Sequence, residues 1–381
     1  MRTKRGRTFW GKVLLLLAIL LVGGISLTGC YGRGQPKGWS GATVSGDSIF
    51  VGSIDGRLVG LNKADGSHLW LDENAGTPGT TKSGVAIYGT PAVDGDLIYV
   101  GSYNGKVYAF VSDSGALDED YPPEGNLAPI VGGLAVSQGT VYFGCSDGKV
   151  YALDAAELRK DWEFQAGGKI WSTPTVEAET IYVSSFDKKL YALSAADGSK
   201  QWEFEVGSTI MTTPLVYEDT VYIGSFDRHV YAVDASTGRQ TWRSEVEGGK
   251  WFWTKPVAHN NVIYAPNLDG KVYMFDAQTG SETAGAVDLG SPISSAPVVV
   301  GNKVIIATEE GNVYSLDTGS KQLSPLVNVG DNGQEVLAPL SASDGIVYVN
   351  AQTSSEDRLY AVNVETQATL WSQSLLISEG D

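Results

Sequence analysis

The sequence is poor in the residues from which metal centres and disulfide frameworks are built. Its 381 residues include two cysteines, three histidines and three methionines. Two cysteines exclude a disulfide scaffold and a multi-cysteine zinc or iron–sulfur site. The histidines, His68, His229 and His259, stand in unrelated surroundings, so we expect no histidine-based metal centre.

Basic residues are also scarce. Lysine and arginine total 27 against 44 aspartates and glutamates, which gives a net charge of −17. Five of the basic residues fall within the first 29 positions, where no acid occurs, so the rest of the chain carries −22. Non-specific binding to nucleic acid requires a basic footprint. We therefore expect no nucleic-acid partner.

A long helical pattern is missing as well. No ten-residue stretch places apolar residues at the 3.6-residue period of a helix, apart from a short candidate turn at residues 155–159. The 47 glycines are costly inside helices and useful in tight turns. The large core that a chain of this length buries is therefore expected to be β.

The first thirty residues are typical of an export signal. A basic stretch is followed by the apolar run Val13–Val22, which is short for a bilayer-spanning helix and suits a signal peptide. The segment ends in Leu27, Thr28, Gly29 and Cys30, which resembles the lipobox of bacterial lipoproteins. The resemblance implies cleavage before Cys30 and acylation of its thiol and amine. An uncleaved anchor followed by a chance cysteine is the alternative.

These features predict four parts of the chain. We expect a lipoprotein signal peptide over residues 1–29, a lipidated tether over 30–37, a repeat domain over 38–376 and a C-terminal tail over 377–381. The acidic body then lies outside the cytoplasm. It is anchored through lipid on the periplasmic side of an outer membrane, or on the outer face of the cytoplasmic membrane where no outer membrane exists.

The repeat domain contains eight copies of one unit. Each copy has an apolar–Tyr–small–apolar piece, and these pieces recur every 40 to 49 residues, at Val59, Tyr108, Tyr151, Tyr191, Tyr231, Tyr273, Tyr314 and Tyr360. The first copy lacks the tyrosine.

Each unit predicts four short strands. The first follows a proline, in a place where proline is tolerated because it begins a strand. The second is a β-branched or aromatic run, for example Leu97–Gly101, Thr180–Ser184 or Thr220–Gly224. A hairpin turn such as Asp147-Gly148 leads to the third, and a turn ending in glycine leads to the fourth. The prolines are Pro91, Pro174, Pro214, Pro256, Pro297 and Pro339.

Eight tandem four-stranded units predict an all-β fold, an eight-bladed β-propeller of antiparallel blades. Stacking the blades around an axis covers both faces of each small sheet. A linear solenoid would need distinct polar caps, whereas the first and last units look like the others. A closed, monomeric ring is therefore favoured, and it needs no exchanged strand because both terminal units carry four candidate strands.

The ends of the units resemble the repeat of the pyrroloquinoline-quinone (PQQ)-binding-like propellers. Two examples are Asp234–Trp242 and Ala195–Trp202. With the lipobox, the chain looks most like the BamB-type lipoproteins, the propeller subunit of the outer-membrane β-barrel assembly machinery. The resemblance implies that a tryptophan docks between neighbouring blades, a role that fits Trp70, Trp162, Trp202, Trp242 and Trp371. Units two, six and seven lack it, which predicts looser contacts there.

The same resemblance raises the alternative of a quinoprotein dehydrogenase. Those enzymes are markedly longer and carry an adjacent Cys-Cys pair, a calcium-bound quinone and an aspartate base. This chain has no such pair, and Cys145 stands where other units carry a serine, as expected of a small buried thiol. We therefore predict no catalytic residue, no metal site, no cofactor and no enzymatic activity.

One set of residues is a candidate binding funnel. The residue usually three before each proline is expected to ring one mouth of the central channel, and several of these residues are aromatic. A plug that closes the mouth against water is the alternative. The ring positions are Trp39, Tyr88, Val131, Trp171, Met211, Trp253, Ser294 and Val336, with Trp251, Phe252, Lys169 and Lys250 beside them.

Sheet edges and long loops provide a second mode of binding, in which a partner segment adds as a strand. The segments Gly76–Ile87 and Asp118–Gly125 are expected to be long loops on neighbouring blades. The sequence thus favours a lipid-anchored, non-enzymatic scaffold that binds envelope proteins, including an outer-membrane β-barrel by analogy. The alternative is a cell-surface ligand-binding propeller in a bacterium without an outer membrane.

Overall fold

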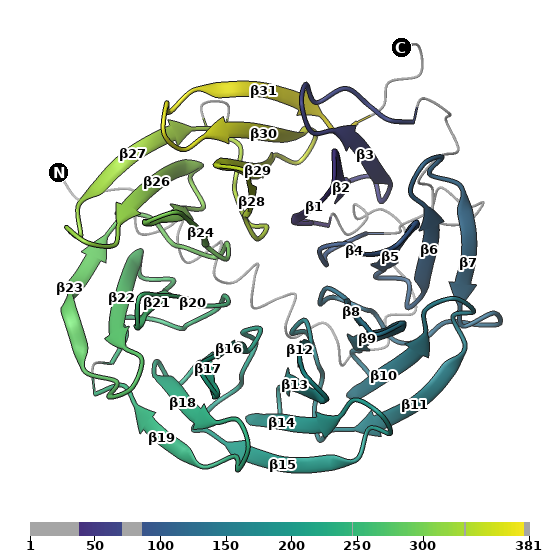
Figure 1. Cartoon of the computed structure of the whole chain (residues 1–381), viewed down its shortest axis with the longest axis horizontal. Helices are drawn as coiled ribbons and strands as arrows, with labels where there is room; N and C mark the ends of the chain where they lie inside the picture. Colours follow the sequence, from purple (N-terminus) through teal and green to yellow (C-terminus); the bar gives the residue numbers. More distant parts are fainter. Residues whose placement is uncertain (1–37, 71–85, 246, 331–332, 377–381) are drawn as a thin grey trace, which may run out of the picture. The chain divides into compact units, whose positions relative to one another are not determined.

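The computed structural model describes residues 38–70, 86–245, 247–330 and 333–376. The predicted signal peptide, lipobox, tether and tail lie outside these residues, and so does most of the segment 76–87. The described residues form 31 β-strands in eight antiparallel sheets (Figure 1) and contain no helix. Within them, no helical segment is long and apolar enough to cross a bilayer.

Each sheet is made of strands that follow one another along the chain, so each sheet is one blade. The first three blades are β1 (Ala42–Ser45), β2 (Ser48–Gly52) and β3 (Leu58–Asn62); β4 (Ala92–Asp94), β5 (Leu97–Gly101), β6 (Val107–Val111) and β7 (Leu117–Tyr121); β8 (Ala135–Ser137), β9 (Thr140–Gly144), β10 (Lys149–Asp154) and β11 (Lys160–Gln165).

Blades 4 to 8 continue the same order. They are β12 (Thr175–Glu177), β13 (Thr180–Ser184), β14 (Lys189–Ser194) and β15 (Lys200–Glu205); β16 (Leu215–Tyr217), β17 (Thr220–Gly224), β18 (Val230–Asp234) and β19 (Gln240–Arg243); β20 (Val257–His259), β21 (Val262–Pro266), β22 (Lys271–Asp276) and β23 (Glu282–Asp288); β24 (Val298–Val300), β25 (Lys303–Ala307), β26 (Asn312–Asp317) and β27 (Leu323–Asn328); β28 (Ser341–Ser343), β29 (Ile346–Gln352), β30 (Asp357–Asn363) and β31 (Thr369–Ser374).

The eight-bladed propeller predicted from the repeats is confirmed. The first strand of each blade lies nearest the centre, and the fourth, where present, lies at the outer edge of the propeller (Figure 1). The second strands predicted at Leu97–Gly101, Thr180–Ser184 and Thr220–Gly224 have the predicted bounds. The second and third strands are almost fully buried, because both of their faces pack against neighbouring blades.

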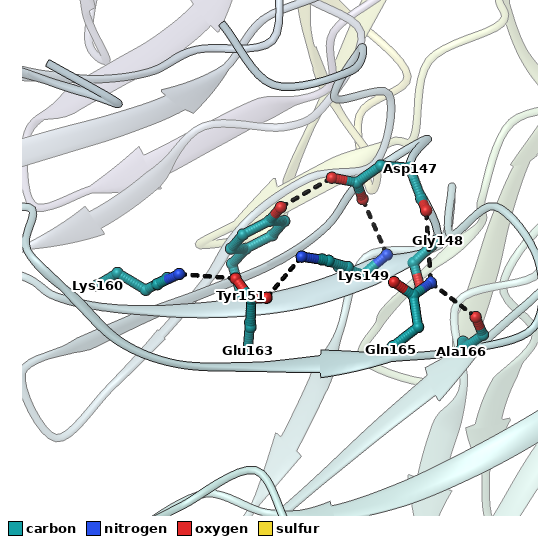
Figure 2. A network of polar contacts seen from close by, with 8 residues as sticks. All are labelled: Asp147, Gly148, Lys149, Tyr151, Lys160, Glu163, Gln165 and Ala166. Atoms are coloured by element: carbon teal, nitrogen blue, oxygen red, sulfur yellow. Dashed lines mark hydrogen bonds and ion pairs between the residues drawn. The ribbon is translucent and has the colours of Figure 1, made fainter. Parts of the chain in front are cut away.

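The hairpin between the second and third strands is held by a repeated aspartate–tyrosine pair. In blade 3 the hydroxyl of Tyr151 donates to Asp147 at 2.8 Å, while Asp147 also accepts the backbone N–H of Lys149 at 2.9 Å (Figure 2). Blades 4, 5 and 6 repeat the Tyr–Asp bond at 2.7 to 2.8 Å. One carboxylate therefore sets the turn and ties it to the third strand.

Two hairpins make this turn without glycine. Lys188 and Arg228 take φ of 74°, the left-handed conformation that Gly148 adopts at φ 86° in blade 3. Lysine and arginine rarely adopt this conformation. The same turn forms in all three blades because the aspartate and the strand pairing hold it, so the missing glycine does not change the fold.

Tryptophan side chains join neighbouring blades. Trp162 of blade 3 donates from Nε1 to the carbonyl of Ala195 in blade 4 at 3.0 Å, and its ring lies on Gly198. A Cβ at Gly198 would lie 2.4 Å from that ring, so the repeat needs glycine there. The same bond joins Trp70 to Ser112, Trp202 to Ala235, Trp242 to Ala277 and Trp371 to Lys63 at 2.8 to 3.1 Å.

The last of these bonds closes the ring, because Trp371 belongs to blade 8 and Lys63 to blade 1. Side chains of β29 and β30 form one core cluster with those of β1, β2 and β3. Each blade seen in the described ranges is built from its own stretch of chain, so within them closure uses no exchanged strand. The fourth strand expected in blade 1 reduces, among the described residues, to a single bridge between Leu61 and His68.

Blades without the tryptophan use other bonds. Between blades 2 and 3, the hydroxyl of Tyr99 donates to the carbonyl of Ala155 at 2.8 Å. Between blades 6 and 7, Lys321 donates to the hydroxyl of Tyr264 at 3.0 Å, and its Nζ lies 5.2 Å from the centre of that ring. The tyrosine bond also accompanies the tryptophan at other seams, as in Tyr182 to Ala235, and between blades 7 and 8 Lys303 pairs with Glu365 at 3.0 Å.

The acidic segment that begins at Asp118 was predicted to be part of a long loop. That prediction is wrong for its first half, because Leu117–Tyr121 is β7, the outer strand of blade 2. Its first charged side chains face solvent. The carboxylate of Asp120 forms a salt bridge with the Nζ of Lys106 at 2.7 Å. Outer-edge strands commonly carry charge, since charged side chains discourage pairing with other chains.

Candidate functional site

One end of the channel is built from a repeated pair of loops. The loop before each inner strand and the hairpin between the second and third strands emerge at the same end of a blade, because the strands are antiparallel. A backbone bond joins the two loops, as in Phe186 N–H to Lys169 O at 2.9 Å and Phe226 N–H to Thr209 O at 3.0 Å. The loops therefore form a firm rim around this end.

Aromatic side chains gather on this rim in three groups. In blades 1 and 2, the rings of Trp39 and Tyr88 lie 4.6 Å apart edge to face, and Tyr103 lies 5.5 Å from Tyr88. In blade 4, Trp171 and Phe186 meet edge to face at 4.9 Å. We call the whole set the aromatic mouth; its members are Trp39, Tyr88, Tyr103, Trp171, Phe186, Phe226, Trp251 and Trp253.

The third group is the largest flat surface of the aromatic mouth. Phe226 of blade 5 stacks on Trp251 at 4.6 Å with 7° between the planes, and on Trp253 at 5.8 Å with 21°. All three side chains are partly exposed. Stacked, part-exposed aromatics present rigid apolar area that can anchor a partner with little loss of side-chain freedom.

Sequence reasoning missed Tyr103, Phe186 and Phe226. Each follows a serine at the end of the second strand and precedes Asn104, Asp187 or Asp227, so the pattern small–Ser–aromatic–Asp/Asn contained the information. These three residues belong to the hairpins, whereas the predicted ring positions all precede the first strand of a blade. The hairpins supply one ring to each of the three aromatic groups.

Two residues of the predicted funnel lie elsewhere. Phe252 is 1% exposed and packs edge to face on Tyr273 inside the core between blades 5 and 6. Val336 is also in the core. The pairing of Ser341 with Tyr348 shows that Leu340, not Pro339, stands at the strand-start position in blade 8, so the ring position there is Leu337.

The remaining ring positions are uneven in character. Trp39, Trp171, Met211 and Trp253 are partly exposed, as is Val131, whereas Tyr88 and Ser294 are buried. Burial raises the pKa of the Tyr88 hydroxyl to about 12. The aromatic mouth is thus open over blades 4 to 6 and closely packed where Trp39 covers Tyr88.

Two lysines stand beside the aromatic side chains. The Nζ of Lys169 lies 5.8 Å from the centre of the Trp171 ring, and the Trp171 Nε1 donates to Ser146 at 2.9 Å. Burial lowers the pKa of Lys250, although Asp269 and Glu309 act in the opposite direction. A cation over an aromatic face is attracted to it, so Lys169 holds its ring in place and adds positive charge to the rim.

Cys145 lies inside blade 3, directly after the second strand β9. Its thiol is fully buried and donates to the carbonyl of Ala128 at 3.2 Å. Burial raises its pKa to about 12, so the nucleophilic thiolate is not populated at neutral pH. Equivalent positions hold a serine, as in Ser185 and Ser225, each of which donates to the same loop.

The residues do not fit a calcium-bound quinone. Over the described ranges, no three side chains of His, Cys, Asp or Glu converge in a way that could hold a metal ion. The aspartates of the hairpins already accept bonds from tyrosine and backbone groups. The chemistry of the aromatic mouth is that of a binding surface.

A closed ring of eight antiparallel blades, seven of them four-stranded among the described residues, with tryptophans docked between several neighbours, is typical of the class of PQQ-like β-propellers. The chain belongs to the family described as "Outer membrane protein assembly factor BamB", which matches residues 37–162, 124–209 and 162–373. None of the curated protein sequences matches it.

Two solved structures are similar to this chain. The computationally designed Ika8 protein has a TM-score of 0.70 at 18% identity, over 87% of this chain and 98% of its own. BamB from Moraxella catarrhalis has a TM-score of 0.67 at 20% identity, over 81% of this chain and 90% of its own. At these identities the likeness establishes the shared fold.

Proposed function

We propose that this chain is a non-enzymatic, lipid-anchored scaffold that binds envelope proteins through its aromatic mouth. The observation that carries the proposal is the part-exposed stack of Phe226, Trp251 and Trp253 on a rigid rim. Family membership supports a role beside outer-membrane assembly proteins, because the family is described as an outer membrane protein assembly factor. A membrane-embedded barrel protein is the proposed partner.

The lipid anchor in this proposal is Cys30. The lipobox-like segment Leu27–Cys30 and the basic, apolar leader before it support export and acylation. The anchor holds the propeller at a membrane surface, which raises its effective concentration near a partner in that membrane. Weak contacts at the aromatic mouth are then sufficient for stable association.

The aromatic mouth is tested by capture from native membranes. The full lipidated chain is cross-linked mildly and purified, and the proteins bound to it are identified. The variant Trp171→Ala/Trp251→Ala/Trp253→Ala should lose the captured barrel protein. Leu370→Ala is the matched control, since Leu370 is a large apolar residue, 49% exposed, on the outer strand β31. Equal capture by the triple variant and the wild type would overturn the proposed role of the aromatic mouth.

The anchor is tested separately. Cys30→Ser should release the protein from membranes, whereas Cys145→Ser should leave it attached. The control is well matched, because serine already stands at the position of Cys145 in other blades and the substitution keeps the bond to the loop. Membrane retention of Cys30→Ser at the wild-type level would contradict a lipid anchor.

The non-enzymatic role is tested with the cofactor of the quinoprotein relatives. Incubation with PQQ and calcium should give no bound quinone absorbance after gel filtration. Stoichiometric quinone absorbance on the protein would overturn this part of the proposal.

A further inference from the structure

The channel contains a cavity on the side of blades 5 to 8. Its volume is about 470 Å³, within the range of small-molecule sites, and it is lined by the inner strands β16, β20, β24 and β28 and the residues just before them. Ten of its twelve lining residues are apolar, and the other two are Tyr217 and Lys255. The cavity is therefore an open, mostly apolar hollow in the channel wall with one cationic group.

Lys255 departs from the repeat. It stands one residue before the strand-start proline of blade 6, where blades 4 and 5 carry Thr173 and Thr213 and blade 7 carries Ala296. The threonines serve the fold, since Thr173 accepts the N–H of Gly133 at 2.9 Å and Thr213 that of Thr173 at 3.3 Å. A lysine at this position does not perform that role.

The ammonium of Lys255 is unpaired within the described part of the chain. It forms no hydrogen bond and no ion pair there, although the sequence contains 44 carboxylate residues. Burial lowers its pKa, and no charged neighbour counteracts this effect. A partly buried cation without a counter-ion is unfavourable unless an anion is supplied from outside.

We propose that this cavity binds a small amphipathic carboxylate, whose anionic head pairs with Lys255 and whose apolar tail lies against the inner strands. The hydroxyl of Tyr217 accepts the N–H of Asn261 at 3.3 Å, which leaves its own proton for a second acceptor. Lys255 is then the polar group that pairs with the head, whereas Tyr217 lines the cavity toward the β20–β21 turn. This ligand site goes beyond the proposed scaffold function and does not depend on it.

The aromatic mouth is the route by which the ligand enters. Trp253, Lys255 and Val257 alternate with the buried Phe252, Thr254 and Pro256, so the first three share the partly exposed face of one extended segment. Since Trp253 belongs to the rim, Lys255 is the next residue inward from it. The positive charge is therefore reached directly from the rim.

Calorimetric titration of the full chain with decanoate tests the proposal. We expect one decanoate bound per chain. Each methylene buried in an apolar site is worth about 0.8 kcal/mol, so octanoate should bind roughly tenfold more weakly. Absence of decanoate binding to the wild-type protein would overturn the proposal.

The role of Lys255 is tested with Lys255→Thr, which installs the residue that blades 4 and 5 already accommodate. We expect at least tenfold weaker binding of decanoate and unchanged binding of uncharged decanol. Lys271→Thr, on the third strand β22 of the same blade and outside the cavity lining, is the matched control and should bind decanoate as the wild type does. If Lys255→Thr binds decanoate as tightly as the wild type, the assignment of the head group is wrong. Capture of an envelope protein by Lys255→Thr remains a separate readout of the scaffold function.

Discussion

The seam between blades 4 and 5 and the seam that closes the ring use the same tryptophan bond but differ in the polar contacts around it. Between blades 4 and 5, the carbonyl of Ala235 accepts both the Nε1 of Trp202 at 2.9 Å and the hydroxyl of Tyr182 at 3.2 Å. At the closing seam, Lys63 O accepts Trp371 alone, and the buried Tyr348 hydroxyl has no partner among the described residues.

The closing seam also carries side-chain bonds between Asp357 and Asn350 of blade 8 and the backbone of the first blade and the segment before it. The backbone N–H of Ile54 donates to the carboxylate of Asp357 at 2.8 Å, and the amide of Asn350 donates to Ser40 O at 3.1 Å. Asp357 is 1% exposed, and burial raises its pKa to about 7. Repetition thus supplies the tryptophan contact at five of the eight seams, and the seam without a covalent connection adds specific polar contacts.

The largest expected effect comes from removing the docking tryptophan. Trp202→Ala should lower the free energy of unfolding by about 3–5 kcal/mol, because Trp202 is buried between two blades and leaves a cavity. Trp371→Ala should cost less, since Trp371 is partly exposed. Urea unfolding of both variants measures the difference. A larger loss for Trp371→Ala would show that closure, and not burial, sets the energy of these contacts.

The next effect is the pH dependence of the closing seam. The folded protein holds the proton of Asp357 more tightly than the unfolded chain, whose carboxyl has an ordinary pKa of 3.8. This stabilisation is complete below pH 3.8, falls as the pH rises toward 7 and is constant above 7. Asp357→Asn keeps an oxygen acceptor for Ile54 and removes the charge.

We therefore expect Asp357→Asn to be more stable than the wild type by about 2–4 kcal/mol at pH 8, with little difference near pH 4. Denaturant midpoints across this range measure it, with Asp120→Asn on the outer strand β7 as control. If the stability of the wild type instead rose relative to that of Asp357→Asn as the pH increases, the raised pKa of Asp357 would be contradicted.

A smaller effect separates two equivalent tyrosines. Tyr182→Phe removes a hydroxyl that donates across a regular seam and should cost about 1 kcal/mol. Tyr348→Phe removes a buried hydroxyl without a partner in the described structure and should be neutral or stabilising. Thermal unfolding of the pair resolves the difference; equal losses would mean that the two seams bind their tyrosines alike.

The smallest effect is expected from the surface ion pair at the closing seam. Lys63 and Asp344 meet at 2.5 Å near the surface, where solvent and salt screen the attraction. Lys63→Met should leave the unfolding midpoint within error at 0.5 M salt. A marked loss of stability at that salt concentration would show that the closing seam depends on this pair.

The repeats predicted the fold because each unit carries its own local signals. The tyrosine of the third strand, the β-branched second strand and the turn residues recur in register, so the number of blades and the bounds of several strands could be read directly. The tryptophans of the fourth strand showed where neighbouring blades meet. These features are local to one repeat unit, so they can be recognised in the sequence.

Several residues of the rim could not be predicted from the sequence. In blade 8, Pro339 comes one residue before the position that proline holds elsewhere, and Leu340 there donates its N–H to Ala296 O at 3.0 Å. Counting from the proline therefore shifted the ring by one residue and placed the buried Val336 in it. The partners Phe186 and Phe226 lie fifteen residues or more from the tryptophans they stack or meet, so only the folded blade brings them together.

The most direct test of the scaffold role is site-specific photo-cross-linking in native membranes. A photoreactive residue at Phe226, in the centre of the open part of the aromatic mouth, should yield a covalent adduct with an integral envelope protein. The same residue at Leu370 on the outer strand should yield none. Adducts from Leu370 but not from Phe226 would contradict binding through the aromatic mouth.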